Sequence, residues 1–484
     1  MLNLAFVSSE ISPYASTGGL ADVCGSLPKA LEHIGYSVTQ FMPMYRRVME
    51  GPHPVEDTGI RLQIPVGFHR YQADIWKSRG KGPAIYFIRR DEFFDRSELY
   101  NLPDRDYDDN FERFIFYQKA VTALIDTLGS PFDIVHAHDW QAGLMGLYLK
   151  HGLSGEGRTQ REKVVFTIHN LAFQGVFGGD NYSYTNLPFS CFSVDTLEFY
   201  GNVNCLKAGI TTADHVTTVS QSYAREIQTP EWGCGLEGVL SEKSDRLSGI
   251  VNGIDPTVWN PEVDKHITAK YSPDDLEGKK SCKADLIRRM KLTIKPSDPL
   301  LGIVTRLTPQ KGIALLDAVL PTIMQETNAG LVILGSGTEE LLALTTGWAK
   351  RWPGRVAAKS GFDIKLAHRI EAGADIYLMP SQFEPCGLNQ LYSLRYGAIP
   401  VVHRVGGLAD TITDVTAQPT AGNGFTFDAF TEDSFLAAVR RAVALYGQPK
   451  RWTEIQRRAM RQDFTWTASA KKYAALYEQV VGSA

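Results

Sequence analysis

Residues 2–45 read LNLAFVSSEISPYASTGGLADVCGSLPKALEHIGYSVTQFMPMY, and this stretch decides the fold class. It begins with an apolar run over 2–8 and, after a glycine pair, continues with apolar residues at helical spacing. Gly35 stands where the C-terminal cap of a helix is expected, and a second extended run covers 37–45. Strand, glycine-rich turn, helix and strand make a βαβ unit, so the sequence predicts a parallel sheet.

Three further apolar runs of the first half each end in polar residues. They are FDIVHAHD at 132–139, KVVFTIHN at 163–170 and HVTTVS at 215–220. In parallel sheets, ligands collect at the carboxyl ends of the strands. We therefore expect one shared site that contains the polar residues at these ends, namely His138, Asp139, His169, Asn170 and Ser220.

The second half of the chain repeats the pattern with five strand-like runs separated by helical segments. The runs are LLGIVTRL, GLVILGSG, RVAAKSGF, DIYLMPS and IPVVHRV. The predicted fold class is therefore α/β with two doubly wound domains. The expected boundary between the domains lies near Gly253, Pro256 and Pro261, because glycine and proline interrupt helices and strands. This gives an N-terminal domain over 1–250 and a C-terminal domain over 251–463, with a last helix over 464–484 that packs back on the first domain.

Composition narrows the class of protein. The 484 residues are 43% apolar and 21% charged, with a net charge of -4, so nothing indicates a nucleic-acid or membrane partner. Six cysteines without CxxC spacing favour a reducing compartment. The opening MLNLAFVSSE reads as a strand and not as a signal peptide, and no apolar run is long enough to span a membrane. We expect a cytoplasmic protein, or a plastid-stroma protein after removal of a transit peptide.

The string GGLAD occurs twice, at 18–22 and at 406–410. Each copy is predicted to open a helix after a strand, where glycine lets a ligand approach the backbone and unpaired amides attract an anion. The alternative is strand–helix packing with no ligand. Two copies, one in each domain, favour a phosphorylated ligand held between the domains.

Two cations follow a strand of the second domain. In TRLTPQKG, Arg306 ends the strand and Lys311 comes five residues later. Both side chains suit phosphate oxygens, Arg as a fork of donors and Lys as a point charge. Taken alone the pair fits ordinary surface charges, but the position at the carboxyl end of a strand favours a phosphate clamp.

Glu384, in PSQFEPCGLNQLYSLRYG, follows a strand and precedes an apparent helix start at 387–389. It could bind a sugar hydroxyl, stabilise a cationic centre or cap the helix. His169 has polar neighbours in Asn170 and Gln174, although a structural histidine is the alternative. Cys386 fits a small buried residue better than a nucleophile. His138 and Asp139 lack a third ligand at suitable spacing, so no metal site is expected.

Several of these strings, in this order, resemble the bacterial glycogen synthase and plant starch synthase family, glycosyltransferase family five. They are SSEISPYASTGGLADV, VHAHDWQAGL, FTIHNLAFQG, LKAGITTADHVTTVS, GIVNGIDPTVWNP, TRLTPQKG and FEPCGLNQLYSLRYG. The resemblance implies a GT-B fold, in which two Rossmann-like domains face a deep cleft. It implies transfer of glucose from ADP-glucose to the non-reducing 4-OH of an α-1,4-glucan such as glycogen or a maltooligosaccharide. It further implies retention of configuration, no metal and no other cofactor; a homo-oligomer is compatible with it.

The same resemblance implies roles for individual residues. Glu384, His169 and Asp139 resemble the catalytic residues, and Phe362 falls where the family stacks an aromatic ring on adenine. The residues that resemble the diphosphate site are Arg306, Lys311, Gly18, Gly19, Leu388 and Asn389. Those that resemble the glucose pocket are Asn252, Cys386, Gly387 and again His169.

Ser16 departs from the family pattern, which usually has lysine directly before the x-GGL turn. If that lysine contributes about 1.5–3 kcal/mol, donor binding or rate falls by roughly tenfold to over a hundredfold here. The hypothesis is that Arg306 and Lys311 carry the diphosphate charge alone. Two alternatives stay open: a synthase that uses UDP-glucose or another nucleotide sugar, and a low-activity glucan-binding homologue. No motif for a lysine-bound pyridoxal phosphate is present, which argues against a phosphorylase.

Overall fold

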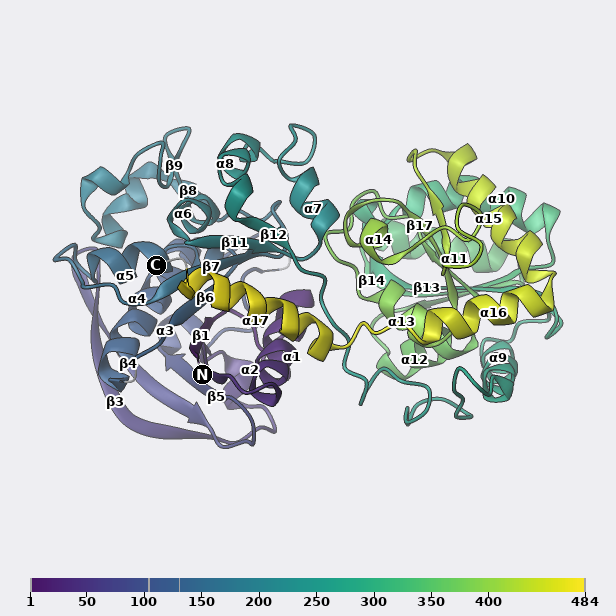
Figure 1. The fold of residues 1–484 in the computed structure, drawn as a ribbon, viewed down its shortest axis with the longest axis horizontal. Coiled ribbons are helices and arrows are strands. Elements are labelled where there is room, and N and C mark those ends of the chain that lie inside the picture. Colours follow the sequence, from purple (N-terminus) through teal and green to yellow (C-terminus); the bar gives the residue numbers. More distant parts are fainter. Residues whose placement is uncertain (1, 103–104, 130, 483–484) are drawn as a thin grey trace. The chain divides into compact units, whose positions relative to one another are not determined.

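The structure is a computed structural model that describes residues 2–102, 105–129 and 131–482. The chain forms two compact units (Figure 1). Unit 1 comprises Met1–Gly253 with Trp466–Ala484, and unit 2 comprises Ile254–Thr465. The observed boundaries follow residues 253 and 465. The predicted boundaries, after residues 250 and 463, lie three and two residues before them.

Unit 1 is built on a nine-stranded sheet with the strand order β12-β11-β7-β6-β1-β2-β5-β4-β3. The pairs from β12 through β5 are parallel, whereas β4 and β3 are antiparallel additions at one edge. The strands are β1 (Asn3–Val7), β2 (Ser37–Pro43), β3 (Val55–Val66), β4 (His69–Ser78), β5 (Ala84–Arg89), β6 (Ile134–His138), β7 (Lys163–Ile168), β11 (His215–Thr218) and β12 (Leu247–Gly249).

The βαβ prediction is confirmed. Helix α1 (Gly19–His33) connects β1 to β2, which pair in parallel with Asn3 opposite Ser37. Its apolar positions are buried, and Gly35 adopts a positive φ of 100° just after the helix. The runs predicted at 132–139, 163–170 and 215–220 contain β6, β7 and β11. The carboxyl ends of β1, β6, β7 and β11 therefore lie along one edge of the sheet.

The antiparallel part of unit 1 was not predicted from the sequence. Strand β3 alternates between exposed and more buried residues along most of its length, because only one face packs against the protein. A separate three-stranded antiparallel sheet has the order β8-β10-β9. Its strands are β8 (Val176–Gly178), β9 (Glu198–Phe199) and β10 (Asn202–Asn204).

The last helix of the chain, α17 (Trp466–Gly482), belongs to unit 1. Trp466, Tyr473 and Tyr477 are buried in one apolar cluster with residues of α1 and β1, and Figure 1 shows the yellow α17 beside the purple α1. The other helices of unit 1 are α2 (Arg46–Met49), α3 (Asp91–Phe94), α4 (Asn110–Leu128), α5 (Met145–His151), α6 (Cys205–Thr212), α7 (Gln221–Glu226) and α8 (Glu237–Glu242).

Unit 2 holds a six-stranded, fully parallel sheet with the order β15-β14-β13-β16-β17-β18. Its strands are β13 (Leu300–Leu307), β14 (Gly330–Gly337), β15 (Val356–Ser360), β16 (Ile376–Met379), β17 (Ile399–His403) and β18 (Phe425–Phe427). Five of them coincide with the predicted runs, and the three-residue β18 was missed. Its helices are α9 (Glu277–Arg289), α10 (Ile313–Glu326), α11 (Glu339–Arg351), α12 (Ile364–Gly373), α13 (Asn389–Arg395), α14 (Gly406–Thr411), α15 (Glu432–Tyr446) and α16 (Pro449–Met460).

The strands of both sheets are rich in buried aliphatic residues, as expected where helices cover both faces of a parallel sheet. Within the described ranges, no helix combines the length and the apolar character that crossing a membrane requires.

Candidate functional site

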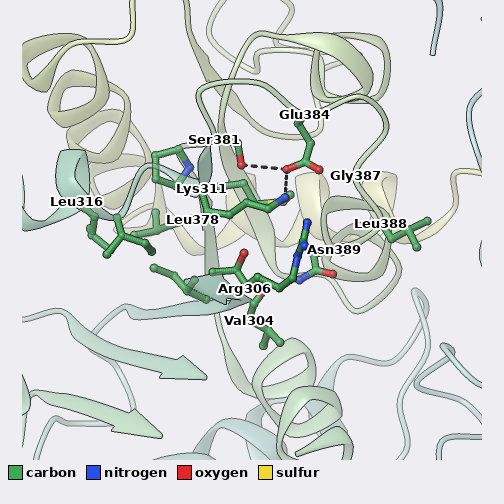
Figure 2. Close-up of a pocket in the computed structure, with 15 residues that line it drawn as sticks. Val304, Arg306, Lys311, Leu316, Leu378, Ser381, Glu384, Gly387, Leu388 and Asn389 are labelled. Atoms are coloured by element: carbon green, nitrogen blue, oxygen red, sulfur yellow. Dashed lines mark hydrogen bonds and ion pairs between the residues drawn. The ribbon is translucent and has the colours of Figure 1, made fainter. Parts of the chain in front are cut away.

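A pocket of about 190 Å³ opens in unit 2 at the carboxyl ends of β13 and β16 (Figure 2). It contains six of the residues proposed for the donor site: Arg306, Lys311, Glu384, Gly387, Leu388 and Asn389. Its position follows from the parallel sheet, because side chains that follow neighbouring strands meet at the same edge. The remaining lining is largely apolar and comes from β13, β16 and α10.

Lys311 and Glu384 form an ion pair in this pocket. The Lys311 Nζ lies 2.5 Å from Glu384 Oε2, and both side chains are largely buried, at 15% and 9% exposed. The Ser381 hydroxyl donates to the same carboxylate oxygen over 3.0 Å. Figure 2 shows both contacts as dashed lines. The carboxylate is thus fixed in position, and the ammonium lies at the pocket wall with a single counter-charge.

Arg306 is exposed at the end of β13 and, among the residues that the structure describes, forms no ion pair. Figure 2 shows its guanidinium in the same region of the pocket as the Lys311 ammonium and the Glu384 carboxylate. An unpaired guanidinium beside a second cation is an arrangement that suits an anion with several oxygens, such as a diphosphate.

Gly387 and Asn389 determine the conformation of the turn from Glu384 to Asn389. Gly387 has a φ of +73°, in the left-handed region that favours glycine. Asn389 Nδ2 donates to the carbonyl of Val304 and to Tyr377 Oη. The Asn389 side chain therefore joins the turn to β13.

The two GGLAD copies are not equivalent, contrary to the reading of both as anion-binding turns. In the second copy, Gly406 and Gly407 are buried against the backbone of the 384–386 turn. The Gly407 N–H already donates to the carbonyls of Glu384 and Pro385 over 3.0 and 3.2 Å. A Cβ on Gly407 would lie 1.9 Å from the Cys386 carbonyl oxygen. This copy supports the Glu384 turn from behind and offers no ligand site.

Two further predicted residues of unit 2, Cys386 and Phe362, do not line the pocket. Cys386 is buried within the turn, as expected for a small packing residue. Phe362 follows β15 and is 89% exposed, one of the most exposed large apolar side chains of the described protein. The next residue, Asp363, caps α12 by accepting from the Leu366 N–H.

In unit 1, Glu10 organises the loop that leads to the first GGLAD copy. Its carboxylate accepts from the backbone N–H and hydroxyl of Thr17 and from the Tyr100 hydroxyl. Gly18 and Gly19 then stand at the exposed start of α1, with open space where a Cβ would be. The amides of this turn are accessible, unlike those of the second copy.

Ser16 is exposed, and a cation that is distant in sequence lies beside it. Arg47, from α2, donates through Nη1 to the Ser16 carbonyl over 3.3 Å and through Nη2 to Glu98 over 3.2 Å. The sequence shows no basic residue next to Ser16, but the fold brings one there. Arg47 is half-exposed, so its charge is partly screened by solvent.

The polar residues at the ends of β6 and β7 come together as predicted. Asp139 accepts from the His169 N–H over 2.8 Å, and the ring of His169 contacts that of His138. Asn252 is buried in unit 1. The Ser220 hydroxyl, at the end of the neighbouring strand β11, caps α7 by accepting from the Tyr223 N–H.

The backbone of Asp139 is strained, and burial disfavours the charged form of its carboxyl. Its φ of 55° and ψ of -177° lie in a region that non-glycine residues rarely occupy. Burial raises the pKa of its carboxyl to about 7, and the negative charge of Glu10 acts in the same direction. Strain together with a raised pKa is typical of functional sites.

Replacing Asp139 by asparagine is expected to change how stability depends on pH. A carboxyl whose pKa is raised on folding favours the folded state most below its unfolded pKa of about 4, and this contribution is lost as pH rises toward 7. The amide of the variant does not titrate in this range. The unfolding free energy of D139N relative to the parent should therefore rise between pH 4 and 7.5, by up to about 4 kcal/mol. Denaturant unfolding at several pH values measures it, and a difference independent of pH would refute the assignment.

Within the described ranges, no group of three or more His, Cys, Asp or Glu side chains is arranged to hold a metal ion. Each unit also contains polar residues near the predicted ones that the sequence analysis missed. Glu10 and Ser381 follow β1 and β16, so the strand-end rule that pointed to Asp139 could have found them. Arg47 and Tyr100 gave no such signal, because they lie in a short helix and a loop.

Two family models match the chain. One described as the starch synthase catalytic domain matches residues 3–242, and one described as glycosyl transferases group 1 matches 287–459. Both fall within the two structural units, and the fold of a pair of Rossmann-like units corresponds to GT-B.

Several known proteins match over almost their full length. A glycogen synthase of Syntrophotalea carbinolica is 40% identical over 99% of both chains, and glycogen synthase 2 of Geobacter metallireducens is 42% identical over 97% of both. The solved catalytic domain of starch synthase IV from Arabidopsis thaliana, bound to ADP and acarbose, aligns with a TM-score of 0.89 and 31% identity over 99% of both chains. Sucrose-phosphate synthase from Thermosynechococcus elongatus, at 17% identity and a TM-score of 0.62, shares the fold. The chain belongs to the family of bacterial glycogen synthases and starch synthases.

Proposed function

We propose that this enzyme elongates α-1,4-glucan chains by transferring glucose from ADP-glucose to the non-reducing 4-OH, with retention of configuration. Glucan elongation by glucosyl transfer is the activity of its family. The observation that carries the proposal is the pocket of unit 2, where two cations and one carboxylate meet at the carboxyl ends of parallel strands. Glycogen or a maltooligosaccharide would be the acceptor.

The reaction creates charges that these residues can stabilise. As the bond between glucose C1 and the β-phosphate oxygen breaks, positive charge grows on the sugar and negative charge on ADP. Arg306 and Lys311 would stabilise the departing diphosphate, assisted by the amides of Gly18, Gly19, Leu388 and Asn389. Glu384 would lie beside the transferred glucose and stabilise its positive charge.

We propose that the acceptor attacks C1 from the face that the diphosphate leaves. A bond forms between the acceptor O4 and C1, and the 4-OH proton passes to the departing phosphate oxygen, so ADP is released. His169, with Asn252, Cys386 and Gly387, would hold the glucose, and Asp139 would act on the acceptor side. No proton transfer in this scheme requires a metal ion or another cofactor.

Phe362 supports adenine as the base of the donor. An exposed aromatic ring beside the pocket-bearing sheet offers a face for stacking, worth about 0.5–1.5 kcal/mol. Phe362→Ala is therefore expected to raise the KM for ADP-glucose about two- to tenfold with little change in kcat, whereas Phe362→Tyr should stay near the parent value. Steady-state kinetics at saturating glycogen measures both, and an unchanged KM in the alanine variant would remove Phe362 from the donor site.

Competition between donors tests the proposed substrate. Equal concentrations of ADP-glucose and UDP-glucose, with the label in one donor at a time, report transfer to glycogen from each. Preferential transfer from ADP-glucose supports the proposal, whereas preference for UDP-glucose favours the alternative donor class. Transfer from neither donor, with intact glycogen binding, would favour a low-activity glucan-binding homologue.

Ser16→Lys is expected to increase kcat/KM for ADP-glucose by up to about tenfold. A charge-assisted hydrogen bond to phosphate gains about 1.5–3 kcal/mol, and the exposure of Ser16 favours the lower end. Arg47 already lies beside Ser16 and is a candidate third cation. The gain from the new lysine should therefore be smaller than it would be if no cation stood there. Ser16→Gln is the uncharged control of similar length. A lysine variant no better than the glutamine variant would show that Ser16 is no deficit.

A further inference from the structure

The contact between His138 and His169 fixes where the protons of both rings lie. His138 ends β6, and His169 follows β7, which pairs with β6 in parallel. His138 Nδ1 lies 3.1 Å from His169 Nε2, a hydrogen-bond distance. Burial lowers the pKa of His169 to about 3 and that of His138 well below its usual range, so both rings are neutral near pH 7. Each neutral ring has one N–H and one bare nitrogen, so only one of them donates in this contact.

The other nitrogen of His138 decides which ring donates. His138 Nε2 is fully buried and has no hydrogen-bond partner among the residues that the structure describes. If His169 donated, the His138 proton would sit on Nε2 as a buried N–H without an acceptor, which proteins rarely tolerate. In the opposite arrangement, His138 Nδ1–H donates and Nε2 is only an unused acceptor. That arrangement is the less costly one.

Two further rings pack against His138. Its ring packs against Phe6 at a centroid distance of 5.4 Å and against His136 at 4.2 Å. His136 is in turn hydrogen-bonded to the Tyr477 hydroxyl over 2.7 Å and to Thr167 Oγ1 over 2.6 Å. Tyr477 belongs to α17, so the C-terminal helix supports this row of rings.

We propose that His138 is a positioning residue that fixes His169 as a neutral imidazole protonated on Nδ1, ready to donate to a hydroxyl of the bound glucose. With Nε2 of His169 accepting from His138, its single proton must be on Nδ1. The backbone of His169 is held by Asp139, so ring and main chain are both oriented. The glucose-binding part of this inference rests on the proposed function, whereas the tautomer of His169 does not.

The tautomer can be measured directly in the full-length enzyme labelled with ¹⁵N-histidine. Long-range ¹H–¹⁵N correlation spectra distinguish protonated from bare ring nitrogens, and His169→Gln assigns the signals of His169. We expect a protonated Nδ1 and a bare Nε2 in His169. A protonated Nε2 would overturn the inference, whether or not the enzyme transfers glucose, so the result is separate from the test of the proposed function.

Two variants of His138 link the tautomer to activity. His138→Asn keeps an N–H donor where Nδ1 stood, so the Nδ1–H form of His169 and most of kcat/KM should remain. His138→Leu removes the donor, so His169 should become a mixture of tautomers and kcat/KM for ADP-glucose should fall about three- to tenfold. His215→Leu removes another buried strand histidine, which contacts Ser248, and should change neither readout.

If His138→Leu and the parent show the same tautomer of His169 and the same kcat/KM, His138 does not position His169. If the leucine variant does not fold, the spectra of the parent and of His138→Asn decide, because both must show a bare His169 Nε2.

Discussion

Glu384→Gln is expected to lower kcat for glucose transfer by about 10²- to 10³-fold, with the smaller change in the KM for ADP-glucose. The variant removes the negative charge that would stabilise the developing positive charge on glucose, and removing a stabiliser of this kind typically costs about that much. Glutamine keeps the size of the side chain and its contact with Ser381. Initial rates at saturating donor and glycogen give kcat directly.

The same substitution leaves Lys311 without its counter-charge. Losing one partner of a buried ion pair costs about 3–5 kcal/mol, so Glu384→Gln should also lower the thermal stability of the unliganded enzyme. Glu326→Gln is the matched control, since Glu326 pairs with Arg440 on the surface of the same unit. That variant should keep full activity and lose little stability, because solvent screens an exposed ion pair. A Glu384→Gln enzyme with parental kcat would remove Glu384 from the reaction.

Arg306→Ala is expected to lower kcat/KM for ADP-glucose by about ten- to a hundredfold and to weaken ADP binding by a similar factor. The guanidinium has no counter-ion among the described residues, so its removal takes one charge-assisted contact from the diphosphate, worth about 1.5–3 kcal/mol. For the same reason the unliganded protein should keep its stability. This combination distinguishes Arg306 from Glu384, whose loss should affect both properties.

Calorimetric titration with ADP measures the binding part of this prediction. Arg404→Ala serves as control, because Arg404 pairs with Asp428 at the surface of unit 2. Weakened ADP binding in both variants would indicate a general charge effect, and unchanged binding in Arg306→Ala would contradict the diphosphate clamp.

The parallel parts of both sheets could be predicted because their strands carry short apolar runs that end in polar residues. The antiparallel edge of unit 1 gave a weaker signal, since β3 alternates along a half-exposed face. The position of residues after strands also identified the charged residues of the pocket, Arg306, Lys311 and Glu384. It could not show that the Ser220 hydroxyl, also at a strand end, caps helix α7.

The repeated GGLAD shows why sequence alone could not complete the site. Five identical residues form an exposed helix start at Gly18 and a buried support at Gly406, and only the neighbouring backbone makes the difference. Arg47 beside Ser16 is a similar case, because the contact joins residues 31 positions apart. Both depend on tertiary packing that no local pattern encodes.

The fate of labelled glucose tests the proposed transfer from ADP-glucose to glycogen most directly. ADP-[¹⁴C]glucose is incubated with glycogen and the enzyme in the presence of EDTA, and the polymer is then digested with an enzyme specific for α-1,4 bonds. If the enzyme extends α-1,4-glucan chains from ADP-glucose, label enters the polymer and is released by the digestion as labelled maltose. Absence of label in the polymer, or label that resists the digestion, would contradict it.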